Sequence, residues 1–170
     1  MTVQLVAGRG WWATKLRQFR AHVRAAVAPS ERAELATWLS AAQLALFDSM
    51  PVADRRHGLD VVGTLRASGT ADHDLLLAGL LHDGGKGHAV GLWPRVAWSL
   101  GERYGSWIWR AARVLPGFAT ALDRMRDHAE RSAELAQRAG CSPRTVDLIR
   151  HQAAPEDGDG VVLQLADEAN

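Results

Sequence analysis

The chain has 170 residues, 47% of them hydrophobic and 23% charged, which is the composition of one globular domain and not of a disordered segment. Its net charge of +1 creates no overall field that would attract nucleic acid, so no stable nucleic-acid partner is expected. The single cysteine excludes an internal disulfide and a multi-cysteine zinc site, and no stretch reaches the roughly 18 apolar residues of a membrane span or resembles a signal peptide. We therefore expect a cytoplasmic protein without a membrane span.

Apolar residues recur at helical spacing along nearly the whole chain, which predicts an all-α, single-domain helical bundle. The first predicted helix, residues 12–27, is basic and carries Leu16, Phe19 and Val23 on one stripe. We expect this stripe to pack on the core. The alternative is that its basic face, with Trp11 and Trp12, contacts an anionic membrane or a nucleic acid.

Further helices are predicted at residues 30–39, 41–50, 54–68, 73–83, 92–104, 106–115, 119–139, 143–153 and 161–169. The expected N-caps are Ser30, Ser40, Asp72 and Ser142. Residues 1–50 are interpreted as a helical extension packed on a core formed by residues 51–170. Four of the seven tryptophans lie between Trp93 and Trp109, and they predict an apolar wall that either packs beside the core or forms a homodimer interface.

Several ionisable side chains fall on apolar helix faces. His57 shares its stripe with Val61 and Leu65, and the pair His82-Asp83 ends the apolar run 75–81. Three more lie on apolar faces further along the chain: His128, His151 and Asp167. A buried ionisable group costs several kcal/mol unless it is paired, and one such histidine alone is more often a hydrogen-bonded core residue or a helix cap than a ligand. Six of them on five helices are explained more simply by one shared metal centre.

Residues 80–87 read Leu-Leu-His-Asp-Gly-Gly-Lys-Gly, and this string resembles the signature of the HD superfamily. The remaining elements follow the family's order: His57 lies 25 residues before the pair, and three further residues come after it, namely His128, His151 and Asp167. The resemblance covers about residues 51–170 and implies an HD-domain-like helical fold. Gly84 stands where the family usually has an apolar residue. Gln152 replaces the second histidine of the cyclic-di-GMP phosphodiesterase branch and no Gly-Tyr-Pro occurs, so that branch is not expected.

The resemblance implies a metal-dependent phosphohydrolase that acts on a phosphorylated small molecule, such as a nucleotide, through metal-activated water. It assigns a first metal to His57, His82, Asp83 and Asp167, and a second to His128 and His151 with Asp83 bridging. This imidazole-rich set suits iron, manganese, zinc, cobalt or nickel.

Asp83 and Lys86 are the predicted catalytic residues, and Lys86, Arg56 and Arg131 the predicted phosphate-binding residues. Two alternatives remain: a di-iron oxygenase of the same superfamily, and a non-catalytic signalling domain whose metal has no open coordination position.

Overall fold

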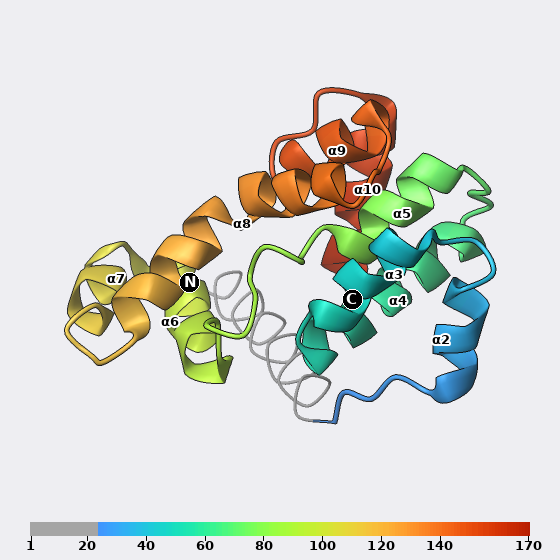
Figure 1. The fold of residues 1–170 in the computed structure, drawn as a ribbon. Coiled ribbons are helices and arrows are strands. Elements are labelled where there is room, and N and C mark those ends of the chain that lie inside the picture. Colours follow the sequence, from blue (N-terminus) through green and yellow to red (C-terminus); the bar gives the residue numbers. More distant parts are fainter. Residues whose placement is uncertain (1–23) are drawn as a thin grey trace.

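The computed structural model describes residues 24–170, and within that range every regular element is an α-helix (Figure 1). The helices are α2 (Pro29–Leu35), α3 (Ala41–Ser49), α4 (Val52–Ala67), α5 (His73–Leu81), α6 (Leu92–Tyr104), α7 (Trp107–Ala112), α8 (Phe118–Arg138), α9 (Pro143–Arg150) and α10 (Gly158–Ala169). The predicted all-α, single-domain architecture is confirmed for these residues. Most of the predicted helix 12–27, including Trp11 and Trp12, lies outside them. None of the described helices is long and apolar enough to cross a bilayer.

Local side chains fix where the helices begin. Three of the predicted N-caps are confirmed, since each accepts a hydrogen bond from the backbone N–H three residues later: Ser40, Asp72 and Ser142. Helix α10 begins earlier than predicted because the Asp157 carboxylate accepts the N–H of Gly160 at 2.7 Å. Helix α2 begins at Pro29 and not after a Ser30 cap, because the fixed φ of proline suits the first helical position.

Helix α5 lies at the centre of the bundle. Every residue from Leu75 to Leu81 is buried, and α4, α9 and α10 pack around the helix. Helices α4 and α5 approach so closely that a Cβ added at Gly58 would collide with the carbonyl oxygen of Leu80. Buried residues from the segment before α4, such as Phe47 and Met50, belong to the same core.

Helices α6 and α7, together with the beginning of α8, form a lobe on the left of Figure 1. Inside it Trp98 and Trp109 stack with ring centroids 4.8 Å apart, and the Trp109 indole N–H donates to the Trp98 carbonyl at 3.1 Å. Trp93 and Trp107 are instead 68% and 59% exposed. Only half of the predicted tryptophan wall therefore packs within the lobe.

Candidate metal centre

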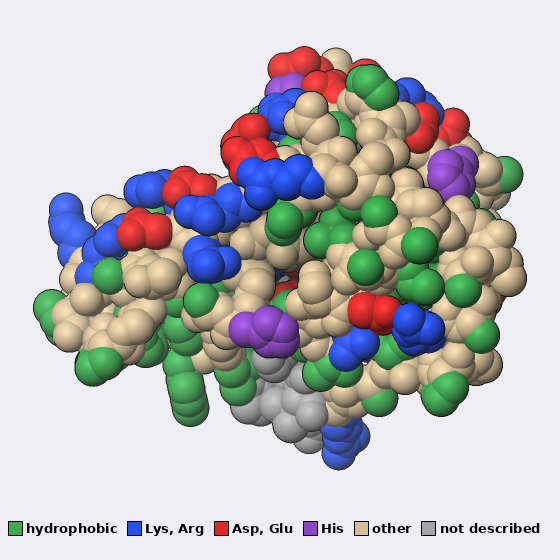
Figure 2. All heavy atoms as spheres, viewed as in Figure 1, with side chains coloured by type: hydrophobic (Ala, Val, Ile, Leu, Met, Phe, Trp, Pro, Cys, Tyr) green, Lys and Arg blue, Asp and Glu red, His purple; other side chains and the backbone are tan. Residues whose placement is uncertain are grey.

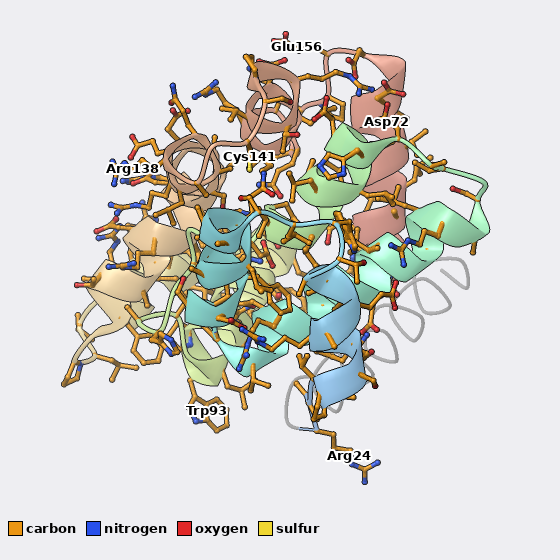
Figure 3. The ribbon with its side chains drawn as sticks, turned by 45° about the vertical axis from the view of Figure 1, so that its right-hand side comes forward. Arg24, Asp72, Trp93, Arg138, Cys141 and Glu156 are labelled. Atoms are coloured by element: carbon orange, nitrogen blue, oxygen red, sulfur yellow. The ribbon has the colours of Figure 1, made fainter. Side chains whose placement is uncertain are left out.

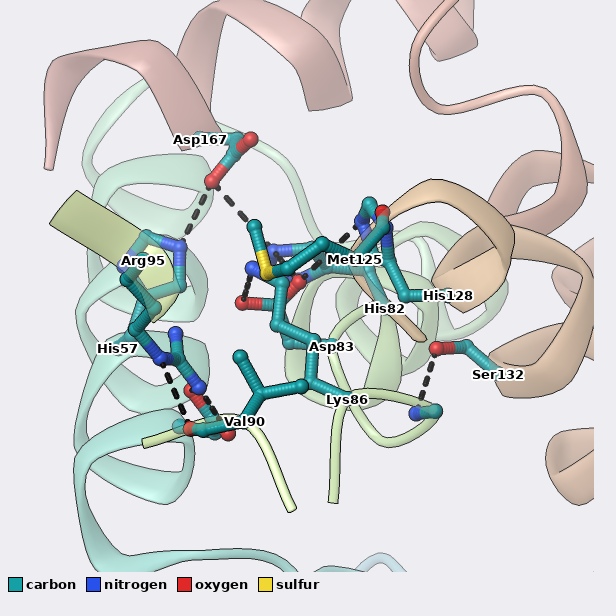
Figure 4. A network of polar contacts seen from close by, with 12 residues as sticks. His57, His82, Asp83, Lys86, Val90, Arg95, Met125, His128, Ser132 and Asp167 are labelled. Carbon is teal, nitrogen blue, oxygen red and sulfur yellow. Dashed lines mark hydrogen bonds and ion pairs between the residues drawn. The ribbon is translucent and has the colours of Figure 1, made fainter. Parts of the chain in front are cut away.

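Side chains from three separate segments meet where α4, the end of α5 and α10 come together (Figure 4). His57 Nε2 lies 2.7 Å from Asp167 Oδ1, and His82 Nε2 lies 3.4 Å from the same oxygen. Asp83 Oδ1 is 3.5 Å from His82 Nε2. One ligand atom each from His57, His82 and Asp167 lies within 4.8 Å of the others. The structure thus brings together all four residues that the resemblance assigns to the first metal.

The position of His82 and Asp83 follows from the apolar run before them. Since all seven residues 75–81 are buried, the helix ends inside the protein, and His82 and Asp83 are each 2% exposed. The chain then turns sharply, with the Gly84 N–H donating to the Leu81 carbonyl at 3.0 Å. A polar pair is therefore delivered into the interior by its leucine-rich helix.

Gly85 holds this turn against α8. Its N–H donates to Ser132 Oγ at 2.8 Å, and a Cβ at this position would lie only 2.7 Å from the Ser132 nitrogen and from Arg131 Cβ. A glycine is thus required for the approach. The contact sets the distance between Asp83, two residues earlier, and the residues of α8.

Backbone carbonyls fix the tautomers of two histidines. His82 Nδ1 lies 2.9 Å from the Gly79 carbonyl oxygen, and His128 Nδ1 lies 2.6 Å from that of Met125. A carbonyl oxygen can only accept, so Nδ1 carries the hydrogen in each ring and Nε2 of the neutral ring presents a lone pair. Both Nε2 atoms face carboxylate oxygens, an arrangement that is favourable when a proton or a metal cation lies between them.

The ionisable side chains of the cluster shift one another's pKa values. Burial lowers the pKa of His82, but the neighbouring Asp83 and Asp167 carboxylates outweigh it and raise that pKa to about 9. Burial raises the pKa of Asp83, yet Lys86 and the nearby histidines hold it well below its usual range. The pKa of Asp167 is likewise lowered, because the His57 and His82 side chains beside it outweigh the effect of its burial. Two carboxylates therefore stay negative, and the cluster attracts a cation.

Asp83 also faces a second group of residues. Its Oδ1 lies 3.7 Å from His128 Nε2, and its Oδ2 accepts from Lys86 Nζ at 2.5 Å. Burial and the positive charge of Lys86 lower the pKa of His128, which favours its neutral form. The Asp83 carboxylate thus contacts three partners: His82 of the first ligand set, His128 and Lys86.

A buried ion pair beside the cluster was not predicted from the sequence. Asp54, one turn before His57 on α4, is 1% exposed and pairs with Arg95 of α6 at 2.8 Å. Burial raises the pKa of Asp54, which Arg95 opposes. Arg95 Nε also reaches the Val90 carbonyl at 3.4 Å, so this pair ties the loop after the turn to α4. The sequence feature that could have suggested that Asp54 lies beside the cluster is its three-residue spacing from His57, which places both on one face of α4.

His151 is not brought to this cluster. Its ring lies 3.3 Å from Asp147 and 3.7 Å from Glu156, because α9 ends at Arg150 and His151 occupies its C-cap. The next residue, Gln152, instead donates to the His82 carbonyl at 3.1 Å. The second predicted ligand set therefore has one histidine in position and not two.

The two predicted phosphate-binding arginines differ in their surroundings, and Arg131 lies against Gly85 of the turn. Arg56 is engaged by Glu31 at 2.6 Å and by Asp60 at 2.9 Å, and Arg131 is exposed. Arg124 also approaches this part of the chain: a Cβ at Gly87 would lie 3.1 Å from its guanidinium nitrogen. No carboxylate pairs with Arg124 among residues 24–170, which leaves its charge available to an anion.

The donors at the cluster fit a divalent transition metal. Two imidazole nitrogens and two carboxylates are a nitrogen–oxygen set, whereas Mg²⁺ and Ca²⁺ prefer oxygen alone. The Asp167 side chain is 43% exposed although His82 is almost fully buried, so the cluster is reached from solvent on the Asp167 side. No family model, curated protein or solved structure matches the chain.

Proposed function

We propose that the protein is a metal-dependent phosphohydrolase acting on a phosphorylated small molecule, with His57, His82, Asp83 and Asp167 as metal ligands. The observation that carries the proposal is the Nε2 atom of His82. It is buried, has no hydrogen-bond partner and lies 3.4 to 3.5 Å from two carboxylate oxygens. An imidazole lone pair of this kind is a ready metal ligand. The resemblance to the HD superfamily supports the same assignment.

The chemistry that a bound divalent metal supplies is an acidified water molecule and a positive charge beside the phosphoryl group. The chain's own groups orient the proposed ligands and hold them in place. The Gly79 carbonyl fixes the His82 ring, and the 2.5 Å ion pair with Lys86 fixes the Asp83 carboxylate. Buried leucines behind the pair exclude water from that side.

Two cations near the turn are suited to hold the phosphate. Lys86 is 14% exposed and is held by Asp83, so its ammonium stays at the cluster. Arg124 approaches the same turn at Gly87 and carries a planar guanidinium that can donate two hydrogen bonds to a phosphate. His128, 3.7 Å from Asp83, is the residue best placed to join a second metal.

Metal analysis tests the ligand set. Protein purified without chelator is expected to contain at least one transition metal per chain, and His82→Gln is expected to lose it. His73→Gln is the matched control, since His73 begins the same helix and is exposed. Equal metal content in the two variants, with both folded by circular dichroism, would refute the proposed centre.

Activity tests the reaction. Phosphate release from nucleotides, sugar phosphates and bis(p-nitrophenyl) phosphate is expected to require the metal and to disappear in His82→Gln. Arg124→Gln is expected to raise KM more than it lowers kcat, whereas Arg138→Gln, an exposed arginine on the same helix, leaves both unchanged. Iron content with O₂ consumption and no phosphate release would identify an oxygenase and overturn the hydrolase proposal.

A further inference from the structure

Exposed large apolar side chains concentrate on the lobe formed by α6 and α7. Four of them define what we call the aromatic face: Trp93 (68% exposed), Trp107 (59%), Val114 (83%) and Leu115 (49%). Figure 2 shows hydrophobic side chains projecting along the margin of this lobe, and in Figure 3 the Trp93 side chain extends away from the ribbon. Water-exposed indoles and aliphatic groups at this density are unusual unless they have a partner.

The same segment is strongly basic. Residues 92–117 contain four arginines and one acid, Glu102, whereas the whole chain has a net charge of only +1. Glu102 accepts the Trp98 indole N–H at 2.9 Å, and Arg95 belongs to the buried pair with Asp54. With Arg95 paired to Asp54, residues 92–117 still carry an excess of positive charge over Glu102, in contrast to residues 154–170, which carry five acids and no base.

A groove of about 260 Å³ opens on this lobe, lined by Trp98, Ser106, Trp109, Arg110, Arg113, Leu122 and Arg126. Arg113 and Arg126 both contact Asp123. Arg110 is exposed, and no carboxylate in residues 24–170 pairs with it. The groove is thus lined by an uncompensated guanidinium and by the two stacked indole rings, which suits a phosphate carried on an apolar group.

We propose that the lobe docks on the surface of a membrane containing anionic phospholipid. Trp93 and Trp107 enter the interfacial layer, where indole rings are favoured, and Arg110 binds a headgroup phosphate in the groove. Charge complementarity favours this occupant over a symmetric dimer, which would bring the same arginine-rich surface against itself, whereas an anionic bilayer offers phosphates and an apolar layer together. This peripheral contact is separate from the proposed metal centre.

Co-sedimentation with liposomes tests the proposal. The full chain is expected to bind vesicles of phosphatidylglycerol and phosphatidylcholine and to bind pure phosphatidylcholine at least about tenfold more weakly. The double variant Trp93→Ser/Trp107→Ser and the single variant Arg110→Gln are each expected to reduce binding to the anionic vesicles by about tenfold. The matched control is Val161→Ser/Leu165→Ser, which removes exposed apolar groups of α10 and is expected to bind as the wild type does.

Three outcomes would overturn the proposal. One is equal binding to both vesicle types or to neither. A second is tight binding of glycerol 3-phosphate without vesicle binding, which would make the groove a site for a soluble phosphate compound. A third is a dimer in light scattering that Trp107→Ser dissociates, which would make the aromatic face an interface between copies. Unchanged metal content in every variant keeps this test independent of the proposed hydrolase.

Discussion

Helices α4 and α5 approach each other closely at Gly58, and replacing this glycine with alanine tests how the two helices position the ligands. The new Cβ would collide with the Leu80 carbonyl oxygen and lie 3.2 Å from its carbon. Both are backbone atoms, so no side chain can rotate away and the two helices must separate. His57, one residue earlier on α4, would move away from His82 at the end of α5.

The magnitude follows from two opposing effects. Inserting a methyl group into a packed core costs about 1–3 kcal/mol, whereas alanine in place of a helical glycine gains about 0.5–1 kcal/mol. Gly58→Ala is therefore expected to lower the free energy of unfolding by up to about 2.5 kcal/mol. Gly63→Ala is the matched control on the same helix: no atom lies within 4 Å of its added Cβ, so only the gain remains.

Urea unfolding of the two variants gives the comparison directly, because the helix-propensity gain is common to both. Their free energies of unfolding should differ by about 1–3 kcal/mol. Titration with Zn²⁺ should show weaker binding in Gly58→Ala alone. If Gly58→Ala were as stable as Gly63→Ala and bound the metal as the wild type does, the argument that backbone contact positions the site would be refuted.

Three further predictions concern the turn, a helix cap and the metal. Ser132→Ala leaves the buried Gly85 N–H without an acceptor and should cost about 1–3 kcal/mol in urea unfolding. Asp72→Ala removes the cap of α5 and should cost about 1 kcal/mol at pH 7. The Leu75 N–H and then Arg144 hold the pKa of Asp72 below its usual value. The contribution of the cap is therefore present above about pH 4 and is lost as the pH falls through the lowered pKa. The free energies of unfolding of the variant and the wild type should thus become equal in acid. Zn²⁺ at about 100 times its Kd should raise the free energy of unfolding by about 2.7 kcal/mol. EDTA should reverse this effect, and His82→Gln should not show it.

Helical periodicity predicted most of the fold because most of the helices bury an apolar set of residues, and three of them begin at a side-chain N-cap that the sequence shows, namely Ser40, Asp72 and Ser142. The run 75–81 shows this best: its seven apolar residues lie in the predicted helix 73–83, and in α5 all seven are buried. The same periodicity placed His57, His82 and Asp167 on inward faces, where the structure has them. Element boundaries were the weaker part, as with the start of α10.

The position of His151 differs from the prediction because the boundary of its helix was predicted wrongly. A helix extended to residue 153 would direct His151 inward, three residues after Leu148, but α9 ends at Arg150 and the ring turns toward Glu156. Arg95 could not be predicted to pair with Asp54, because that contact depends on where α6 lies relative to α4. Patterns within one helix carry no such information.

The distance between His57 and Asp167 along the chain, 110 residues, has a consequence for the order of assembly. During synthesis, a nascent polypeptide that has reached Asp83 contains three of the four proposed ligands but lacks the helix that supplies the last one. Metal loading would therefore come late and would depend on α10 having packed on α4. Incorporation of the ion would then mark chains in which this 110-residue separation has been closed, and unfinished chains would stay inactive.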